Sequence, residues 1–262
     1  MKRLLTGLSI QKTYQNIKRI STMSKRAIIL AGGKGKRLLP YTIVLPKPLM
    51  PIGEYPILEV VVRQLAFYGF RHITMAVNHQ AEIIQAFFGK GKKWKVKIDY
   101  SFEDKPLSTI APLKLISNLP EDFLVMNGDI LTDLNYSDFY QFHINKKSIF
   151  LISSYKRELK SEFGVLEFDK NAKLKEFKEK PVVRYNVSMG IYMANRTILE
   201  YIPNNKPYGF DNLMLDLIKA GKPATVKPFH GCWLDIGRPD DYIQAIDEFE
   251  KNGFLFLKEL KK

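Results

Sequence analysis

The chain has 262 residues, and 45% of them are hydrophobic, so it can bury the core of one or two domains. A single cysteine, Cys232, excludes an intrachain disulfide, and no stretch approaches the roughly 18 apolar residues of a membrane-spanning helix. The net charge of +14 leaves nucleic acid, an anionic membrane surface and anionic small substrates as partners to weigh. We therefore expect a soluble, cytoplasmic protein without a membrane span.

The first 25 residues differ from the rest of the chain. Residues 1–25 are basic, contain no acidic residue and have a loosely amphipathic pattern, as transit peptides do. Met23 lies just ahead of the first long apolar run, so an upstream start codon or an inessential extension also explains the segment. We favour this second explanation and expect a flexible basic extension over residues 1–25. Residues 26–262 are then expected to form a single domain.

The first half of that domain alternates between strand and helix patterns. Apolar runs bounded by glycine and proline predict the strands, and wider apolar periods predict the helices. In chain order they are a strand at 28–30, a helix between 56 and 69, a strand at 72–77, a helix at 80–88, a strand at 95–102, a helix at 109–116 and a strand at 123–126. Such alternation favours an α/β fold, Rossmann-like, with a mixed and mostly parallel sheet flanked by helices.

The pattern changes after residue 148 to successive strands. Strands are predicted at 149–154, 165–168, 173–177 and 186–193, followed by a helix at 211–220 that ends before Gly221. We expect these strands to form a β-rich half within the same domain.

A lysine-rich run at 90–97 raises the question of nucleic-acid binding. Trp94, Val96 and Ile98 alternate with Lys95 and Lys97, which is the period of a half-exposed strand. A basic patch is only the first of several signs of nucleic-acid binding. We therefore expect these lysines to line a solvated face, and we predict no nucleic-acid partner.

A short apolar strand runs directly into Gly32, Gly33 and Gly35. Glycine lets the backbone turn sharply and leaves its N–H groups open to anionic oxygens. Arg37 offers a planar fork of donors for phosphate, and Lys47 lies between two prolines that stiffen its loop. The combination suits a polyphosphate, although an ordinary turn with solvated basic side chains would have the same sequence.

Two familiar phosphate-binding loops do not match this turn. The dinucleotide fingerprint needs a third glycine where the chain has Leu38, so hydride transfer loses its main support. A Walker loop needs Ser or Thr after Gly-Lys, but Gly35-Lys36 is followed by Arg37 and Gly91-Lys92 by Lys93. A P-loop ATPase or kinase is therefore not expected.

Two aspartates are candidates for a metal site. Asp129 follows the predicted strand at 123–126, at the sheet edge where open α/β sheets bind ligands. Asp235 lies in an apolar stretch, where an unpaired charge would be costly. One or two carboxylates suit Mg²⁺ when substrate phosphates complete its shell. Alternatively, Asp129 forms a local turn, and Asp235 pairs with Arg238 or caps a helix that begins near Pro239.

Several motifs occur in one order along the chain: GGxGxRL with a downstream PKP, then Asn127-Gly128-Asp129, Phe163-Gly164-Val165, Glu179-Lys180-Pro181, Ser188-Met189-Gly190-Ile191-Tyr192 and Trp233-Leu-Asp-Ile-Gly-Arg-Pro239. Together they resemble the signature of the sugar-1-phosphate nucleotidyltransferases, also called nucleotide-sugar pyrophosphorylases. The resemblance covers about residues 26 to 250 and is closest in general pattern to the mannose-1-phosphate guanylyltransferases.

The resemblance implies that a nucleoside triphosphate and a sugar 1-phosphate give a nucleotide sugar and pyrophosphate. It implies catalytic roles for Arg37, Lys47, Asp129 and Asp235, with Mg²⁺ held by the two aspartates. Nucleotide-binding residues would be Leu30, Ala31, Gly32, Gly33, Gly35 and Thr109. Sugar-phosphate-binding residues would be Gly164, Glu179, Lys180, Ser188 and Gly190.

One departure concerns the nucleobase loop. Many relatives have Leu-Gly-Thr-Ala-Gly, whereas this chain has Leu107-Ser-Thr-Ile-Ala-Pro112 after Glu103. Because of the added Cβ atoms, the identity of the nucleobase stays open. Guanine is the first expectation, and thymine, uracil, cytosine and adenine are alternatives. The sugar is expected to be mannose, or glucose on the likeness of the Ser188 segment to adenylyltransferases. A catalytically silent regulatory relative and a homo-oligomer also stay open.

Overall fold

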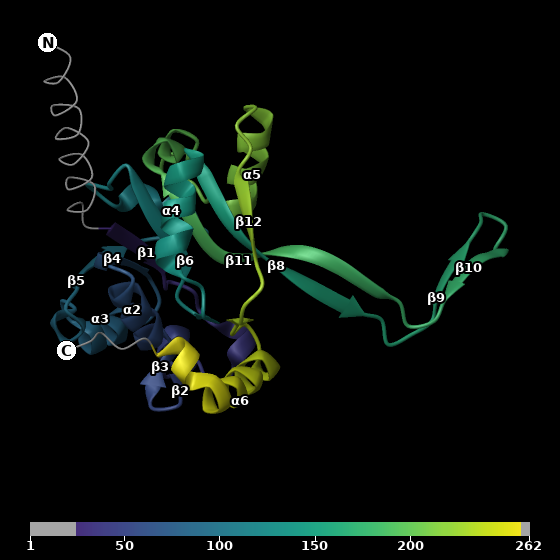
Figure 1. Cartoon of the computed structure of the whole chain (residues 1–262), viewed down its shortest axis with the longest axis horizontal. Coiled ribbons are helices and arrows are strands. Elements are labelled where there is room, and N and C mark those ends of the chain that lie inside the picture. Colours follow the sequence, from purple (N-terminus) through teal and green to yellow (C-terminus); the bar gives the residue numbers. More distant parts are fainter. Residues whose placement is uncertain (1–24, 258–262) are drawn as a thin grey trace, which may run out of the picture.

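The computed structural model describes residues 25–257, and a seven-stranded sheet lies at the centre of this range (Figure 1). Its strand order is β12-β8-β11-β6-β1-β4-β5. The strands span Thr225–Phe229 (β12), Phe150–Lys160 (β8), Val182–Asn195 (β11), Asp122–Asn127 (β6), Lys25–Leu30 (β1), Phe70–Val77 (β4) and Lys97–Phe102 (β5). Strand β11 runs antiparallel to both of its neighbours, and the other pairs are parallel. The predicted mixed, mostly parallel sheet is confirmed.

Helices cover both faces of this sheet. They span Ile57–Phe67 (α2), Ala81–Phe88 (α3), Tyr136–Lys146 (α4), Phe210–Lys219 (α5) and Pro239–Phe256 (α6), with 3₁₀ turns at Lys92–Trp94 (η3), Ala111–Leu115 (η4) and Arg196–Glu200 (η5). Ile29 packs in one core with α2, α3 and α4, whereas Ile28 packs in the opposite core with η4, η5 and α5. Because β1 is buried on both faces, its apolar residues are consecutive rather than alternating.

A third core holds two strands at the edge of the fold. Strand β7 (Ile130–Thr132) pairs antiparallel with β13 (Trp233–Asp235), and both pack with α6 against Met50 and Ile52. Ile52 belongs to the short hairpin of β2 (Pro51–Ile52) and β3 (Tyr55–Pro56). This core therefore fixes residues 130 and 235 side by side although they are far apart in sequence.

Most predicted elements are present, with some corrections. The helix predicted at 109–116 is wrong as an α-helix: only the 3₁₀ turn η4 forms, where Pro112 supplies no N–H for an α-helical bond. The strand predicted from residue 95 begins at Lys97, because Lys95 has a left-handed φ of 55° after η3. Trp94, Val96 and Ile98 are nevertheless buried, as the alternation predicted. Lys25 begins β1, and the rest of the predicted extension lies outside the described residues.

The predicted β-rich half is present but leaves the body of the molecule. Strands β8 and β11 continue past the sheet as a two-stranded ribbon, which leads to the hairpin of β9 (Val165–Phe168) and β10 (Leu174–Lys178). Figure 1 shows this ribbon and hairpin extending far from the remaining elements. We call residues 156–187 the arm. None of the helices described between residues 25 and 257 combines the length and hydropathy needed to cross a membrane.

Candidate active site

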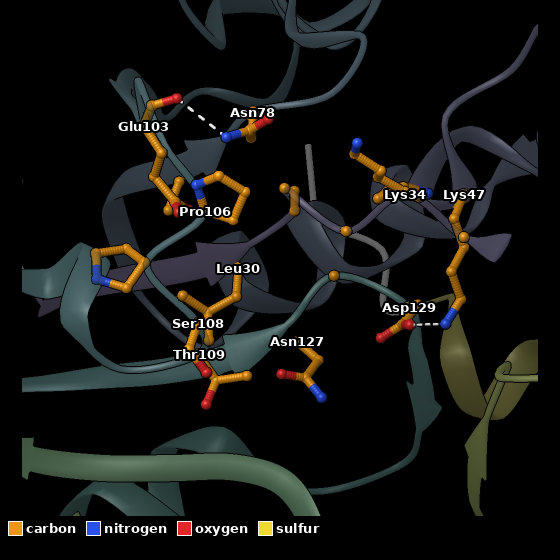
Figure 2. Close-up of a pocket in the computed structure, with 18 of the residues that line it drawn as sticks. Leu30, Lys34, Lys47, Asn78, Glu103, Pro106, Ser108, Thr109, Asn127 and Asp129 are labelled. Carbon is orange, nitrogen blue, oxygen red and sulfur yellow. Dashed lines mark hydrogen bonds and ion pairs between the residues drawn. The ribbon is translucent and has the colours of Figure 1, made fainter. Parts of the chain in front are cut away.

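A cavity of about 680 Å³ opens at the carboxyl ends of β1, β4 and β6 (Figure 2). Open α/β sheets bind their ligands at this edge. Nine of the predicted site residues line the cavity: Leu30, Ala31, Gly32, Gly33, Gly35, Arg37, Lys47, Thr109 and Asp129. Sequence reasoning missed other wall residues, among them Lys34, Asn78, Glu103, Ser108, Asn127 and Gly237. The structure thus brings the glycine turn, both predicted cations and one predicted carboxylate together.

The glycine turn is held against the segment that follows it. Gly35 has a left-handed φ of 61°, and a Cβ there would lie 2.9 Å from Thr42 Cγ2. The Thr42 hydroxyl donates a hydrogen bond of 2.9 Å to the Gly35 carbonyl. A side chain at residue 35 would therefore be strained and would also collide with Thr42. The backbone conformation of the turn therefore depends on packing against Thr42 as well as on the conformational freedom of glycine.

Arg37 and Lys47 reach the cavity from two 3₁₀ turns, η1 (Lys36–Leu38) and η2 (Lys47–Leu49). The Arg37 guanidinium lies over the backbone of Gly237, since a Cβ on Gly237 would be 3.5 Å from its Nη2. Lys47 Nζ forms an ion pair with the Asp129 carboxylate, as Figure 2 shows. Two positive charges thus flank the glycine turn, and the ion pair with Asp129 fixes that of Lys47. This arrangement suits a substrate with several phosphate groups.

The two predicted metal ligands are neighbours. Asp235 pairs with Ile130 in the β7–β13 ladder, and the Ile236 N–H donates to the Asp129 carbonyl at 3.2 Å. Burial raises the pKa of Asp235, and the negative charge of Asp129 raises it further, while Lys47 and Arg37 oppose these effects. Asp129 lines the cavity, whereas Asp235 does not. The sequence alone left this proximity open, and the β7–β13 pairing creates it.

The alternative roles of Asp235 are not realised. In residues 25–257 no ion pair joins it to Arg238, and the start of α6 has no capping side chain. The same range contains no cluster of three or more His, Cys, Asp or Glu residues that could hold a metal ion. Two adjacent carboxylates at the edge of a cavity that suits phosphate groups nevertheless fit a divalent ion whose remaining ligands are phosphate oxygens and water. The residues present therefore suit the implied metal.

The far end of the cavity is formed by the loop after β5. The Asn78 side chain donates to the Glu103 carbonyl at 3.0 Å (Figure 2). The Leu107 N–H donates to Glu103 Oε2 at 3.0 Å. Burial raises the pKa of Glu103, and the Leu107 N–H opposes this rise. Ser108 has a φ of 70°, a left-handed value that non-glycine residues seldom adopt.

The predicted sugar-phosphate residues fall into two groups. Gly164, Glu179 and Lys180 are exposed on the arm and do not line the cavity (Figure 1). They lie close to one another, since a Cβ on Gly164 would be 3.2 Å from Glu179 Oε2. Ser188 and Gly190 belong to the body end of β11.

Gly190 lies directly behind a cavity wall. Its φ is 73°, and a Cβ there would be 2.7 Å from the side-chain nitrogen of Asn127, which lines the cavity. The irregular register of β8 and β11 between Ser188 and Tyr192 creates this close approach. Ser188 and Gly190 are thus near the cavity, whereas the structure does not bring the three arm residues to it.

Comparison with known proteins gives a consistent assignment. The sequence profile described as "Nucleotidyl transferase" matches residues 26–252. A UTP–glucose-1-phosphate uridylyltransferase of Synechocystis is 34% identical over 241 residues, which cover 84% of this chain and 62% of the relative. The catalytic subunit beta of a mannose-1-phosphate guanylyltransferase of Drosophila melanogaster is 33% identical over 228 residues, with coverages of 84% and 62%. The chain therefore spans about three fifths of the length of these relatives.

Solved structures share the same fold. HddC from Yersinia pseudotuberculosis, also solved in complex with GMP-PN, matches with a TM-score of 0.66 and 26% identity, covering 86% of this chain and 99% of HddC. A candidate glucose-1-phosphate thymidylyltransferase from Bacillus anthracis matches in fold with a TM-score of 0.70 and 23% identity, covering 91% of this chain and 98% of that one. The chain belongs to the nucleotidyl transferase family, as the resemblance to the sugar-1-phosphate nucleotidyltransferases predicted.

Proposed function

We propose that the chain transfers a nucleoside monophosphate from a nucleoside triphosphate to a hexose 1-phosphate and releases pyrophosphate. One observation carries the proposal: a glycine turn, two cations and the Asp129 carboxylate line one cavity, and Asp235 is a direct neighbour of Asp129. The names of its relatives describe this kind of reaction.

The residues of the cavity act by position and charge. The N–H groups of the glycine turn and the Arg37 guanidinium bind the β- and γ-phosphates, so Arg37 neutralises the departing pyrophosphate. Lys47 binds the α-phosphate, and its ion pair with Asp129 holds the ammonium group in place until substrate arrives. The attacking sugar phosphate is already anionic near neutral pH, so no side chain has to remove a proton. Orientation for in-line displacement and charge neutralisation then supply the catalysis.

Asp129 and Asp235 are the residues that would hold Mg²⁺. When bound there, the ion would neutralise phosphate charge beside Lys47. Like charges on two neighbouring carboxylates repel each other, and the raised pKa of Asp235 reflects this repulsion together with burial. The pair is therefore better stabilised by a divalent cation than by the single Lys47 ammonium group.

For the substrates we propose GTP and mannose 1-phosphate. Guanine presents N1–H and N2–H₂ donors along one edge, and a carboxylate is the side chain that accepts from both. Glu103 lines the cavity, and its Oε1 lies by Gly32, 3.4 Å from the position of an added Cβ. Several relatives are named mannose-1-phosphate guanylyltransferases, and HddC binds GMP-PN. The second candidate is UTP with glucose 1-phosphate, which the Synechocystis relative favours.

For the arm residues we propose contact with the sugar 1-phosphate. Lys180 would neutralise its phosphate, and Glu179 would accept hydrogen bonds from sugar hydroxyls beside Gly164. Their exposure and mutual proximity support this role. Because they do not line the cavity, contact with substrate requires that the arm approach a nucleotide-filled cavity.

A substrate matrix tests the proposed reaction. Five nucleoside triphosphates are combined with a panel of hexose 1-phosphates and Mg²⁺, and pyrophosphate formation is measured. We expect release only when triphosphate, divalent ion and sugar 1-phosphate are all present, with the highest kcat/KM for GTP and mannose 1-phosphate. Binding of nucleotide sugar without turnover in any combination would contradict the proposal and would support a silent regulatory protein instead.

A further inference from the structure

The cavity wall contains an amide side chain that the protein itself does not satisfy. Asn127 is the last residue of β6, is half-buried and lines the cavity. Within residues 25–257 its Oδ1 and Nδ2 have no hydrogen-bond partner, whereas Asn78 in the same wall donates to the Glu103 carbonyl (Figure 2). An amide offers one acceptor oxygen and two N–H donors. These groups of Asn127 are therefore available to a ligand.

Packing holds the Asn127 side chain in place. A Cβ on Gly190 would lie 2.7 Å from Nδ2 and 3.2 Å from Cγ, so the glycine backbone lies directly against the amide. The Gly190 N–H in turn donates to Ser188 Oγ at 3.3 Å. The carbonyl of Met189 accepts from Trp233 Nε1 at 3.0 Å, which fixes the same segment. The amide is thus held ready for a ligand without a protein partner that the ligand would have to displace.

A hydroxyl group belongs to the same cavity wall. Thr109 lines the cavity, and its Oγ1 accepts a hydrogen bond of 2.9 Å from the Phe210 N–H. The Phe210 ring stacks on that of Tyr192, with 4.4 Å between the centroids, and so ties the Thr109 loop to β11. Because Oγ1 already accepts from the backbone, the Thr109 hydroxyl has its hydrogen left to donate to a ligand.

These side chains lie in the middle of the cavity. Asn127 pairs with Leu30 in the β1–β6 ladder, and Leu30 packs in the same core as Leu107 from the loop after β5. Asp129, beside the proposed α-phosphate position, is only two residues from Asn127, a Cα separation of at most about 7 Å. Figure 2 shows Asn127 between Thr109 and Asp129. In a nucleoside triphosphate the ribose lies between the base and the α-phosphate, so the ribose is the part that meets this stretch of wall.

We propose that Asn127, together with Thr109, binds the 2′- and 3′-hydroxyls of the ribose and makes the chain select ribonucleoside over deoxyribonucleoside triphosphates. The inference rests on the proposed nucleotidyl transfer and names the residues that recognise the pentose of its nucleotide. A vicinal diol has two donors and two acceptor oxygens, which one amide matches with its carbonyl oxygen and its NH₂ group.

Discrimination follows from what a deoxyribose cannot offer. A substrate without one hydroxyl leaves part of the Asn127 amide without a partner in the complex, and a site built to bind a hydroxyl rejects the analogue that lacks it. The 2′-hydroxyl is the group that distinguishes the two kinds of nucleotide. Thymidine triphosphate in its ordinary form is a deoxyribonucleotide, so the selection also disfavours the thymine alternative.

Kinetics with deoxy analogues test the proposal. The kcat/KM is measured for GTP, 2′-deoxy-GTP and 3′-deoxy-GTP with mannose 1-phosphate and Mg²⁺. Three proteins are compared: the native chain, Asn127→Leu, which keeps the size of the side chain, and the control Asn145→Leu at an exposed position of α4. We expect the native chain and the control to prefer GTP about tenfold or more over each analogue, the effect of one lost hydrogen bond to the amide. In Asn127→Leu the preference should fall to about twofold or less.

A binding measurement separates this inference from the proposed reaction. Isothermal titration calorimetry with GTP and 2′-deoxy-GTP, without sugar 1-phosphate, needs no turnover and should show the same preference in the dissociation constants. If this preference is present but no nucleotide is turned over, the proposed reaction is wrong and the ribose recognition stands. Absence of binding by any nucleotide would overturn both.

Two results would overturn the ribose recognition while leaving the reaction intact. The first is turnover of GTP and both deoxy analogues by the native chain with equal kcat/KM. The second is a preference for GTP that stays unchanged in Asn127→Leu, because another residue would then recognise the hydroxyls. Thermal unfolding of Asn127→Leu and Asn145→Leu beside the native chain checks that both variants fold.

Discussion

The nucleotide cavity and the arm are both built from strand ends, yet they hold their side chains in opposite ways. Lys47 and Asp129 come from separate elements and fix each other, and Asp235 reaches them through a second ladder within a third core. Glu179 and Lys180 depend on one two-stranded ribbon with no core beneath it. The body is therefore preorganised for its ligand, whereas the arm has no core of its own that would hold its side chains in one arrangement.

A core truncation should give the largest effect in this comparison. Phe123 on β6 is fully buried, so Phe123→Ala should lower the free energy of unfolding by about 3–5 kcal/mol at any protein concentration. Phe168→Ala on the arm should change it by less than about 0.5 kcal/mol in dilute solution. Urea denaturation at two concentrations measures both. A large loss for Phe168→Ala in dilute solution would show that the arm packs on its own body.

Substitutions of two lysines, one in the cavity and one on the arm, should affect catalysis in different ways. Lys47→Ala should lower kcat/KM on the order of 10²–10³-fold, because it removes a preorganised charge at the reacting phosphate. Lys180→Ala should raise the KM for sugar 1-phosphate about tenfold, the loss of one charge-assisted contact, and leave the KM for triphosphate unchanged. Initial-rate kinetics distinguish the two patterns. If both substitutions changed kcat and the two KM values in the same way, Lys180 would belong to the nucleotide site.

The nucleobase end of the cavity gives a smaller effect. Glu103→Gln should lower kcat/KM for GTP about 10- to 100-fold, since a charged acceptor of two guanine donors becomes a neutral amide. The value for UTP should fall much less, and the exposed control Glu54→Gln should change neither. Equal losses for both nucleotides would mean that Glu103 only holds its loop through the Leu107 N–H.

An ion-pair comparison gives the smallest expected effect. Glu59 in the body is 2% exposed and accepts hydrogen bonds from Trp94 and Arg63, with Lys93 at 3.3 Å. Burial alone would raise the pKa of Glu59, but these donors lower it overall. Glu59→Gln should cost about 1–2 kcal/mol of unfolding free energy at neutral pH. Replacing Glu158, whose pair with Arg184 on the arm is exposed, should cost nothing measurable.

The pH dependence of Glu59 follows from the sign of its shift. A carboxyl group whose pKa is lower in the folded state stabilises the fold above its unfolded pKa, and this stabilisation disappears as the pH falls through the folded value. The difference in unfolding free energy between the native chain and Glu59→Gln should therefore shrink as the pH falls below about 4.5, the ordinary value. A difference that stays constant with pH would contradict the lowered pKa.

The sequence predicted the parts that local patterns determine. The continuous apolar run of β1 and the glycine turn after it predicted the sheet edge and the phosphate-binding end of the cavity. Helix α4 was missed, because its sequence is largely polar and its start depends on Asn135, whose side chain accepts from Ser137 and Asp138 N–H groups. The helix expected at 109–116 failed because periodicity does not register the missing N–H of Pro112.

Long-range pairing was harder to predict. Nothing local to Asp235 shows that β13 pairs with β7, which places it beside Asp129. The sequence singled out Glu103 only because it precedes the loop whose sequence differs from that of many relatives. Its place in the cavity wall depends on β5 lying next to β4. The direction of the arm was not predicted either, since strand patterns give no information on where a ribbon leaves a sheet.

Single substitutions at Asp129 and Asp235 show whether the two neighbouring carboxylates take part in the reaction. Pyrophosphate release is measured with GTP, mannose 1-phosphate and Mg²⁺ for Asp129→Asn, Asp235→Asn and the exposed control Asp247→Asn. We expect each of the first two to lower the rate on the order of 10²–10³-fold and Asp247→Asn to match the unaltered chain. Unchanged release for Asp129→Asn or for Asp235→Asn would contradict the proposed mechanism, because that carboxylate would then have no part in the reaction.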